Sequence, residues 1–281
     1  ELAAASGRDL ASWSKVWLEE AGVTLLRPVI TTSEDGTIER LEITQEAFSE
    51  GASLRPHRMG VAGYSLTEEG TLAQVFREEL DIDGASTVIE AAAGIARPDF
   101  ILVNDGDLGY AKVRLDEDSL SFGLEHIEAF TDSLPRSIVL ASAWDMVRDG
   151  ELAASRFLDA ALRALGVEEH SSVIQGLLGR ITTCLSGFLP PAVRRDLAPG
   201  TADRLLGLAR AAQPGSDKQL QLVRALADLD LGPCSINIAS LHRQHVDAGS
   251  PDFSMWLPEQ VGASVGKKGE TVKQQDVVLY G

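Results

Sequence analysis

The sequence predicts a multidomain α+β protein in which a short β-sandwich is followed by an α-helical bundle or solenoid domain. Between residues 25 and 115, short apolar or alternating runs are separated by acidic, glycine-containing turn signals. From residue 118 onwards, the apolar residues recur with the spacing of amphipathic helices. The chain has 281 residues, of which 44% are hydrophobic and 24% charged, which suits one large globular domain or two ordinary ones.

Residues 2–21 are expected to form a single helix. Trp13 and Trp17 lie four residues apart and therefore share one helical face. Gly22 is expected to end this helix, because glycine favours the backbone conformation that follows a last helical turn. We interpret the two tryptophans as core anchors rather than as a binding site.

Seven segments are expected to form strands, because each is apolar or alternating and is bounded by residues that favour turns. They cover residues 25–31, 38–44, 57–66, 72–80, 87–90, 100–103 and 110–115. Several short strands at this spacing predict an antiparallel sandwich.

Five helices are expected in the following part of the chain. They cover residues 133–150, 151–165, 170–185 and 202–211, and a last one begins at residue 216. The pairs Pro190-Pro191 and Pro199-Gly200 are expected to interrupt the chain before the fourth helix. Consecutive amphipathic helices with short links predict a bundle or solenoid, although no exact sequence period indicates a named repeat class.

The net charge of −17 argues against nucleic acid as a partner, because a polyphosphate would repel the chain. The basic clusters are only Arg194-Arg195 and Lys267-Lys268. No apolar run reaches the roughly 20 residues that a membrane helix needs. The two cysteines are far apart in the sequence and predict no disulfide framework, so a reducing, cytoplasmic location is expected.

The acidic, glycine-rich segment 104–117 raises the question of a calcium loop. Counted from Asp105, the fifth position is Gly109, the sixth is Tyr110 and the twelfth is Asp116. A calcium loop requires an oxygen ligand at the fifth position, glycine at the sixth and glutamate as a rule at the twelfth. The Asp-Gly pair and the apolar flanks instead predict a turn between two strands.

No complete catalytic motif is present. None of the five histidines is followed by glutamate, so the zinc motif H-E-x-x-H is absent, as is the serine motif G-x-S-x-G. The glycine-rich segment 262–268 is one residue too short for a phosphate-binding loop. His242 and His245, with Cys234 upstream, could hold a metal ion, but two surface histidines in a loose tail are the simpler interpretation.

One helical face carries an unusual charge pattern. Asp145 and Asp149 are like charges four residues apart, which is unfavourable unless Arg148 or a group outside the helix compensates. We interpret this face as solvated or as part of a domain interface rather than as a ligand site.

Several phrases of the sequence, in order, resemble the C-terminal portion of aminopeptidase N enzymes, closest to the actinobacterial type. They are ASWSKVWL (11–18) with GVTLLRP (22–28), LVND (102–105) with YAKVRLD (110–116), SLPR (133–136) with AWDMVRD (143–149), and GSD (215–217) with QLQLVR (219–224). The resemblance covers about residues 9–230.

The resemblance implies the non-catalytic part of a zinc exopeptidase that removes single residues from peptide N-termini. In this family the zinc ligands and the general base lie in an upstream domain, and the sequence contains none of them. The chain is therefore expected to bind no zinc and to be inactive alone, with peptide substrates engaged through the missing domain and no nucleic acid or membrane partner. Since the chain begins without methionine, further residues are expected upstream.

The resemblance also suggests a division into parts. Residues 1–23 would be the terminal helix of the missing catalytic domain, 24–116 the β-sandwich and 117–230 an incomplete helical domain. Residues 231–281, which lack a sustained period, would be a divergent tail that need not be folded.

The helical domain of the family forms a bowl over the active-site cleft. Trp144 is expected to contribute packing there, with Asp145 and Arg148 near a domain interface or the cavity wall. The alternative is a stand-alone scaffold that binds peptides or proteins without enzymatic activity.

Overall fold

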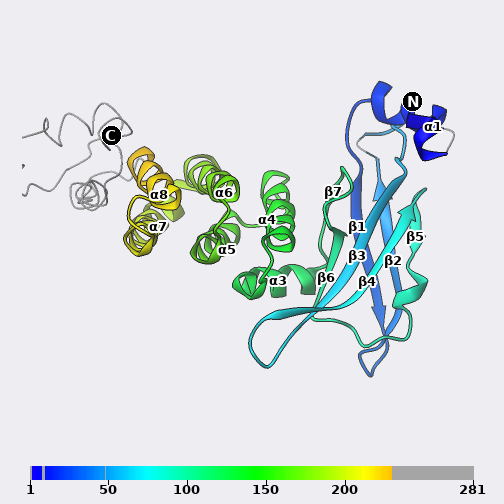
Figure 1. Ribbon diagram of the computed structural model, residues 1–281, viewed down its shortest axis with the longest axis horizontal. Helices are drawn as coiled ribbons and strands as arrows, with labels where there is room; N and C mark the ends of the chain where they lie inside the picture. Colours follow the sequence, from blue (N-terminus) through cyan, green and yellow to red (C-terminus); the bar gives the residue numbers. More distant parts are fainter. Residues whose placement is uncertain (1, 8–9, 48, 230–281) are drawn as a thin grey trace, which may run out of the picture. The chain divides into compact units, whose positions relative to one another are not determined.

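The computed structural model describes residues 2–7, 10–47 and 49–229. By the contacts among its residues, the chain divides into two compact units, Glu1–Leu152 and Ala153–Gly281 (Figure 1). The first unit holds both β-sheets and the helices α3 and α4, and the second is helical. The segment 231–281, including Cys234, His242 and His245, lies outside the described residues.

The N-terminal segment is not the single helix expected over residues 2–21. It forms a short helix α1 (Leu2–Ser6), a helical turn α2 (Ala11–Ser14) and a π-helical turn η1 (Lys15–Glu19). The chain leaves α1 at Gly7, whose φ of 67° is incompatible with a continuing right-handed helix.

The predicted β-sandwich is present as two sheets (Figure 1). The strands are β1 (Leu25–Thr32), β2 (Ile38–Glu46), β3 (His57–Leu66), β4 (Leu72–Ile82), β5 (Ser86–Val88), β6 (Phe100–Asp105) and β7 (Lys112–Val113). One sheet has the order β5-β2-β1-β7 and the other β4-β3-β6. All strand pairs are antiparallel except β1 and β7, which run parallel.

The sandwich core follows from the alternation of the strands. In β2, Ile38, Leu41 and Ile43 are buried while Glu39 and Arg40 are exposed. Because successive side chains of a strand point to opposite faces, Leu41 and Ile43 share the core face of β2. The pairing of β1 with β2 shifts register between Thr31 and Thr32, which brings Ile38 into the same core although it lies three residues before Leu41. The core cluster contains Leu26, Ile38, Leu41, Ile43, Met59, Val61, Ile82, Ile89, Ala92, Ile101, Val103 and Val113.

The segment after β6 forms a turn between two strands, as predicted. β6 ends at Asp105 and β7 begins at Lys112. The two strands belong to different sheets, so the turn carries the chain from one layer of the sandwich to the other.

Two helices follow the sandwich within the first unit. α3 (Glu117–Glu125), which lies outside the helix ranges expected from the sequence, begins where the Asp116 side chain accepts a hydrogen bond from the backbone N–H of Ser119. A 3₁₀ turn η3 (Ile127–Ala129) leads to α4 (Ser133–Arg148), which begins at its predicted residue. Both α3 and α4 contact β6.

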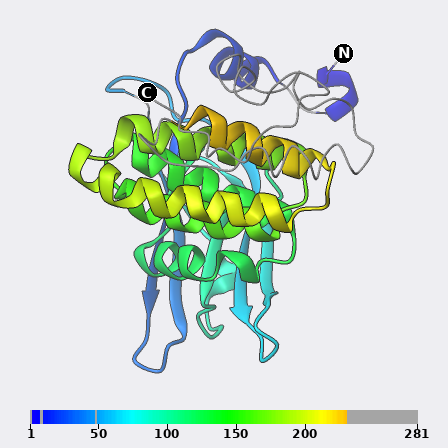
Figure 2. The same cartoon turned by 90° about the vertical axis from the view of Figure 1, so that its left-hand side faces the viewer.

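The second unit contains four α-helices in its described part. They are α5 (Ala154–Val167), α6 (Ser171–Thr183) with the π-helical turn η4 (Cys184–Phe188), α7 (Pro191–Ala211) and α8 (Asp217–Asp228). α7 and α8 lie side by side (Figure 2). No helix in the described ranges combines the length and the apolar character needed to cross a membrane.

The interruption expected at Pro190-Pro191 is confirmed, because η4 ends at Phe188 and α7 begins at Pro191, but the one expected at Pro199-Gly200 is wrong, because α7 continues through both residues. Proline is well tolerated in the first helical turn, where its missing N–H has no intrahelical acceptor. Pro199 and Gly200 both lie on the exposed side of the helix, where water can bond to the carbonyl that Pro199 leaves without a donor. The buried side of α7 continues on both sides of this point, at Ala198, Thr201, Ala202, Leu205 and Ala209.

Candidate functional site

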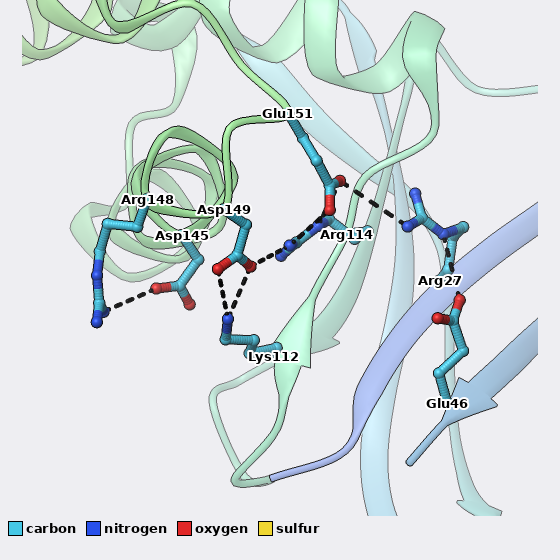
Figure 3. A network of polar contacts seen from close by, with 8 residues as sticks. All are labelled: Arg27, Glu46, Lys112, Arg114, Asp145, Arg148, Asp149 and Glu151. Atoms are coloured by element: carbon cyan, nitrogen blue, oxygen red, sulfur yellow. Dashed lines mark hydrogen bonds and ion pairs between the residues drawn. The ribbon is translucent and has the colours of Figure 1, made fainter. Parts of the chain in front are cut away.

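A group of linked charges joins the sandwich to the end of α4 (Figure 3). We call it the charged junction and define it as Arg27, Lys112, Arg114, Asp149 and Glu151. Arg27 lies on β1, Lys112 on β7, and Arg114 directly after β7. Asp149 and Glu151 follow α4. Because Lys112 and Arg114 are two residues apart in extended chain, their side chains point to the same side.

Arg114 lies at the centre of the charged junction, and its side chain is 0% exposed. Its Nε and Nη2 donate hydrogen bonds to the two carboxylate oxygens of Glu151, at 2.9 and 3.0 Å. Nη2 also donates to Oδ2 of Asp149. Paired N–H groups on one carboxylate form a bidentate contact, which fixes orientation as well as distance. The buried charge is thereby compensated by two carboxylates.

Lys112 and Arg27 complete the charged junction. The Lys112 ammonium donates to both carboxylate oxygens of Asp149, at 2.8 and 2.7 Å. Arg27 forms a longer ion pair with Glu151, at 3.9 Å from Nη2 to Oε2. β7 is held in place from the other side, since the backbone N–H groups of Lys112 and Arg114 donate to carbonyls of residues 24 and 26.

The end of α4 brings the two acids to the same place. Gly150 has a φ of 79°, and its N–H donates to the carbonyl of Val147 while that of Glu151 donates to Met146. This pair of bonds is the Schellman ending of a helix, which needs a left-handed residue after the cap. Gly150 therefore turns the chain so that Glu151 reaches Arg114 alongside Asp149.

The cations lower the pKa values of both acids. Hydrogen bonds from Lys112 and then Arg114 lower the pKa of Asp149 below its ordinary value. The hydrogen bonds from Arg114 do the same for Glu151. Both groups are therefore charged at neutral pH, and the charged junction acts as an electrostatic clamp rather than as a proton donor or acceptor.

A second polar group lies where the N-terminal segment meets the sandwich. The ring of Trp17 stands edge-on to that of His57, with 5.2 Å between centroids, and the Arg55 guanidinium lies 4.9 Å from the centre of the Trp17 ring. His57 Nε2 is 2.8 Å from the Thr24 hydroxyl. Burial, with a smaller effect of the positive charge of Arg55, lowers the pKa of His57 to about 4.

These contacts correct the interpretation of the two tryptophans as core anchors. The side chain of Trp13 is exposed, and Trp17 is half-buried against His57 and Arg55. Trp17 therefore joins the segment to the end of the sandwich at which β3 begins, and Trp13 is not part of the core.

Neither group is a metal centre. Within residues 2–7, 10–47 and 49–229, no three His, Cys, Asp or Glu side chains gather in a way that could hold a metal ion.

Comparison with known proteins assigns the chain to a family. Residues 100–261, more than half of the chain, match the family described as the ERAP1-like C-terminal domain. The chain belongs to this family. The matched range of the ERAP1-like domain covers β6, the turn, β7 and all the following helices, and it contains every residue of the charged junction except Arg27.

The chain is similar to a known peptidase over most of its length. It is 45% identical to aminopeptidase N of Streptomyces lividans over 274 residues, which cover 94% of this chain and 32% of that protein. The solved structure of Legionella pneumophila aminopeptidase A in complex with aspartic acid matches with 13% identity and a TM-score of 0.49, over 95% of this chain and 32% of that one. The chain thus spans about a third of the length of each.

The structure brings together two of the three site residues predicted for this ERAP1-like domain. Asp145 and Arg148 form an ion pair on α4, with 3.5 Å between Oδ1 and Nη1. Trp144, the neighbouring residue on α4, is half-buried. Arg148 does not compensate both acids, because Asp149 is paired with Lys112 and Arg114. The unfavourable Asp145–Asp149 spacing is thus resolved from outside the helix.

Sequence reasoning singled out Asp149 but missed the other four members of the charged junction, Arg27, Lys112, Arg114 and Glu151. Arg114 and Asp149 are 35 residues apart, so no local pattern links them. Two signals were nevertheless present. Lys112 and Arg114 alternate within an apolar strand, and an acid stands on each side of Gly150 directly after a helix.

Proposed function

We propose that this chain is the C-terminal, non-catalytic part of a zinc-dependent aminopeptidase that removes N-terminal residues from peptides. We further propose that its helical domain covers and shapes the active-site cleft. The observation that carries the proposal is membership of the ERAP1-like C-terminal domain family together with 45% identity to an aminopeptidase N over only 32% of that protein.

The chemistry of the site supports a non-catalytic role. When bound in a peptidase, zinc polarises the scissile carbonyl and lowers the pKa of a bound water. The described residues offer no group that could hold the ion, and the full sequence lacks H-E-x-x-H. We therefore place the zinc site outside this chain and assign no step of peptide hydrolysis to its residues.

The charged junction supports a positioning role. It fixes the end of α4 against β7 through a fully buried guanidinium, so the first long helix of the helical part has one orientation on the sandwich. A cleft that must exclude water needs walls of fixed geometry. We propose that Trp144 contributes packing to this wall and that Asp145 and Arg148 lie at a domain interface or at the cavity.

The test compares the chain alone with the same chain joined behind the preceding part of Streptomyces lividans aminopeptidase N. Each is purified free of host peptidases and assayed on alanyl and leucyl anilides with and without zinc. We expect turnover only from the joined polypeptide. Zinc-dependent turnover by the 281-residue chain alone would disprove the proposal, and saturable peptide binding by that chain without any activity in the joined form would favour the scaffold alternative.

We also propose that the natural setting is the cytoplasm and that the partners are peptides rather than nucleic acid. The net charge of −17 supports the second point, since it opposes binding to a polyphosphate. Cell fractionation with an antibody against the chain tests the location, and a filter-binding assay at low salt tests the absence of nucleic-acid binding.

A further inference from the structure

The most exposed large apolar side chains of the described residues gather at one end of the sandwich. Leu18 on η1 is 72% exposed, and Tyr110 and Leu108 in the turn between β6 and β7 are 71% and 61% exposed. Trp13 on α2 is also exposed. Val75, the next in order at 59%, lies on β4.

Hydrogen bonds place η1 and the turn at the same end. The backbone N–H of Lys112, which ends the turn, donates to the carbonyl of Thr24, just before β1. The hydroxyl of the same Thr24 contacts His57, whose ring lies against Trp17 of η1. Figure 1 shows the N-terminal helices at this end of the sandwich, where β1 begins.

The N-terminal segment has apolar side chains that this chain does not bury. Between Ala11 and Glu19, all of which are described, no side chain is buried, although Trp13, Trp17 and Leu18 are among them. Short helices in proteins are stabilised mainly by packing of an apolar face. An apolar segment whose side chains remain exposed indicates a surface that another part of a protein covers.

The turn that presents Leu108 and Tyr110 is rigidly built. Asn104 and Asp107 have φ angles of 65° and 54°, in the left-handed region that Asn and Asp adopt more readily than other non-glycine residues. The buried Asn104 side chain maintains it, because its amide donates to the carbonyl of Gly109 at 3.0 Å and its oxygen accepts from the Gly109 N–H at 2.8 Å.

Gly109 also brings the turn close to the sheet. A Cβ atom at this position would lie 2.5 Å from Cε of Met59 and 3.2 Å from Oδ1 of Asn104, so a larger residue would require the end of the Met59 side chain to move. Leu108 and Tyr110 flank Gly109 and are held outward by a backbone that is fixed in advance. Such preorganisation lowers the entropy cost of binding, so outward apolar side chains on a turn held by internal hydrogen bonds suit a contact site.

We propose that Trp13, Leu18, Leu108 and Tyr110 form a docking surface for the preceding part of an aminopeptidase polypeptide, with Leu108 and Tyr110 as its anchors. This inference rests on the proposed function. Two comparisons support this occupant: the chain spans only 32% of its aminopeptidase N relative, and the family it belongs to is a C-terminal domain. A second copy of the chain is disfavoured as occupant, because two molecules that each carry a net charge of −17 repel one another.

The test measures hydroxyl-radical modification of single side chains in the isolated chain and in the joined polypeptide described above. In the joined form we expect modification of Leu108 and Tyr110 to fall about tenfold, because the core of an interface excludes water. Val75 is the matched control and keeps its rate. Unchanged rates at Leu108 and Tyr110 in a joined polypeptide that hydrolyses anilides would overturn the docking surface and leave the proposed function intact.

Two other outcomes also count against the docking surface. A joined polypeptide that is folded but inactive, with both side chains still modified rapidly, would reject the proposed function and the docking surface together. Modification that falls in the isolated chain as its concentration rises would show that a second copy is the occupant.

A variant series provides an independent readout. We expect Leu108→Ser and Tyr110→Ser each to lower the thermal unfolding midpoint of the joined polypeptide by about 2 °C or more, with no effect on the isolated chain. Val75→Ser leaves both midpoints unchanged. Equal effects of Leu108→Ser in the two forms would show a role within the sandwich itself and would overturn the inference.

Discussion

The guanidinium of Arg114 shows what a fully buried charge requires from its surroundings. It donates two hydrogen bonds to Glu151 and one to Asp149. Both acceptors follow helix α4, whereas Arg114 follows strand β7. Removing one partner of a buried ion pair is costly, because the other charges lose their compensation. The charged junction is therefore expected to respond to single substitutions far more strongly than an ion pair on the surface.

Replacement of Arg114 tests this expectation. We expect Arg114→Ala to lower the free energy of unfolding by about 3 kcal/mol, and Arg114→Lys to recover only part of the loss, because lysine lacks the planar fork. The matched control is Arg58→Ala, which removes exposed ion pairs to Glu79 and Asp81 and should lower the free energy of unfolding far less than Arg114→Ala does. Urea unfolding followed by circular dichroism gives both values, and equal losses would contradict the assignment.

His57 is expected to make stability depend on pH in a defined window. Its folded-state pKa of about 4 lies below the ordinary value of 6.5, because burial disfavours the charged ring. Between these values the unfolded state binds the proton and the folded state does not, so stability is fully present above pH 6.5 and falls as the pH drops towards 4.

The measurement is urea unfolding at a series of pH values, with the wild-type chain and His57→Gln. In the variant, the free energy of unfolding should fall less steeply between pH 6.5 and 4 than it does in the wild-type chain. Glu151→Gln is the control, since the lowered pKa of Glu151 affects stability only below its ordinary value of 4.5. If His57→Gln retained the full slope, other groups would be responsible.

At the scale of elements, strands were predicted better than helix boundaries. The bounds of β3 were correct, because a long apolar run between turn signals leaves few alternatives. The predicted helix began at residue 202 instead of Pro191, because Pro199 and Gly200 are residues that usually end a helix, although both face solvent here. α3 lies where helices were expected from residue 118 onwards, but it was given no bounds of its own; its Gly123 weakens a helical pattern but allows close packing against Phe100. Such tertiary contacts are not visible in a single sequence.

Replacement of Gly200 and of Gly123 by alanine should change the stability of the chain in opposite directions. A Cβ at Gly200 would have nothing within 4 Å, so Gly200→Ala should stabilise the chain by about 1 kcal/mol through helix propensity alone. A Cβ at Gly123 would lie 2.8 Å from Cε2 of Phe100, so Gly123→Ala should destabilise the chain despite the same gain in propensity. Thermal unfolding of the two variants decides the point, and a gain from Gly123→Ala would be inconsistent with this packing.

At the scale of the whole molecule, the order of sandwich and helices was predictable because patterns of period two and period 3.6 are separated along the chain. The charged junction was not predictable, since it joins Arg27, residues 112–114 and residues 149–151 only after folding. The family resemblance stated from phrases such as AWDMVRD is confirmed by the match to the ERAP1-like C-terminal domain.

Zinc binding provides a prediction for the chain as a whole. We expect equilibrium dialysis of the 281-residue chain to show no retained zinc, because the described residues hold no ligand group and the pair His242 and His245 lacks a defined third ligand. The joined polypeptide should retain zinc under the same conditions. If the isolated chain retained zinc, and lost it on replacement of His242 and His245 by alanine, a metal site in the C-terminal segment would be established.

The Schellman ending at Gly150 restricts how α4 can change in length. Each residue added to a helix rotates everything after it by about 100° around the helix axis. A single insertion between Ser133 and Arg148 would therefore swing Asp149 and Glu151 away from Lys112 and Arg114 and break every ion pair between them. α4 can grow or shrink only in steps close to whole turns, so insertions and deletions in natural variants should be absent from this helix and concentrated in the turns between strands.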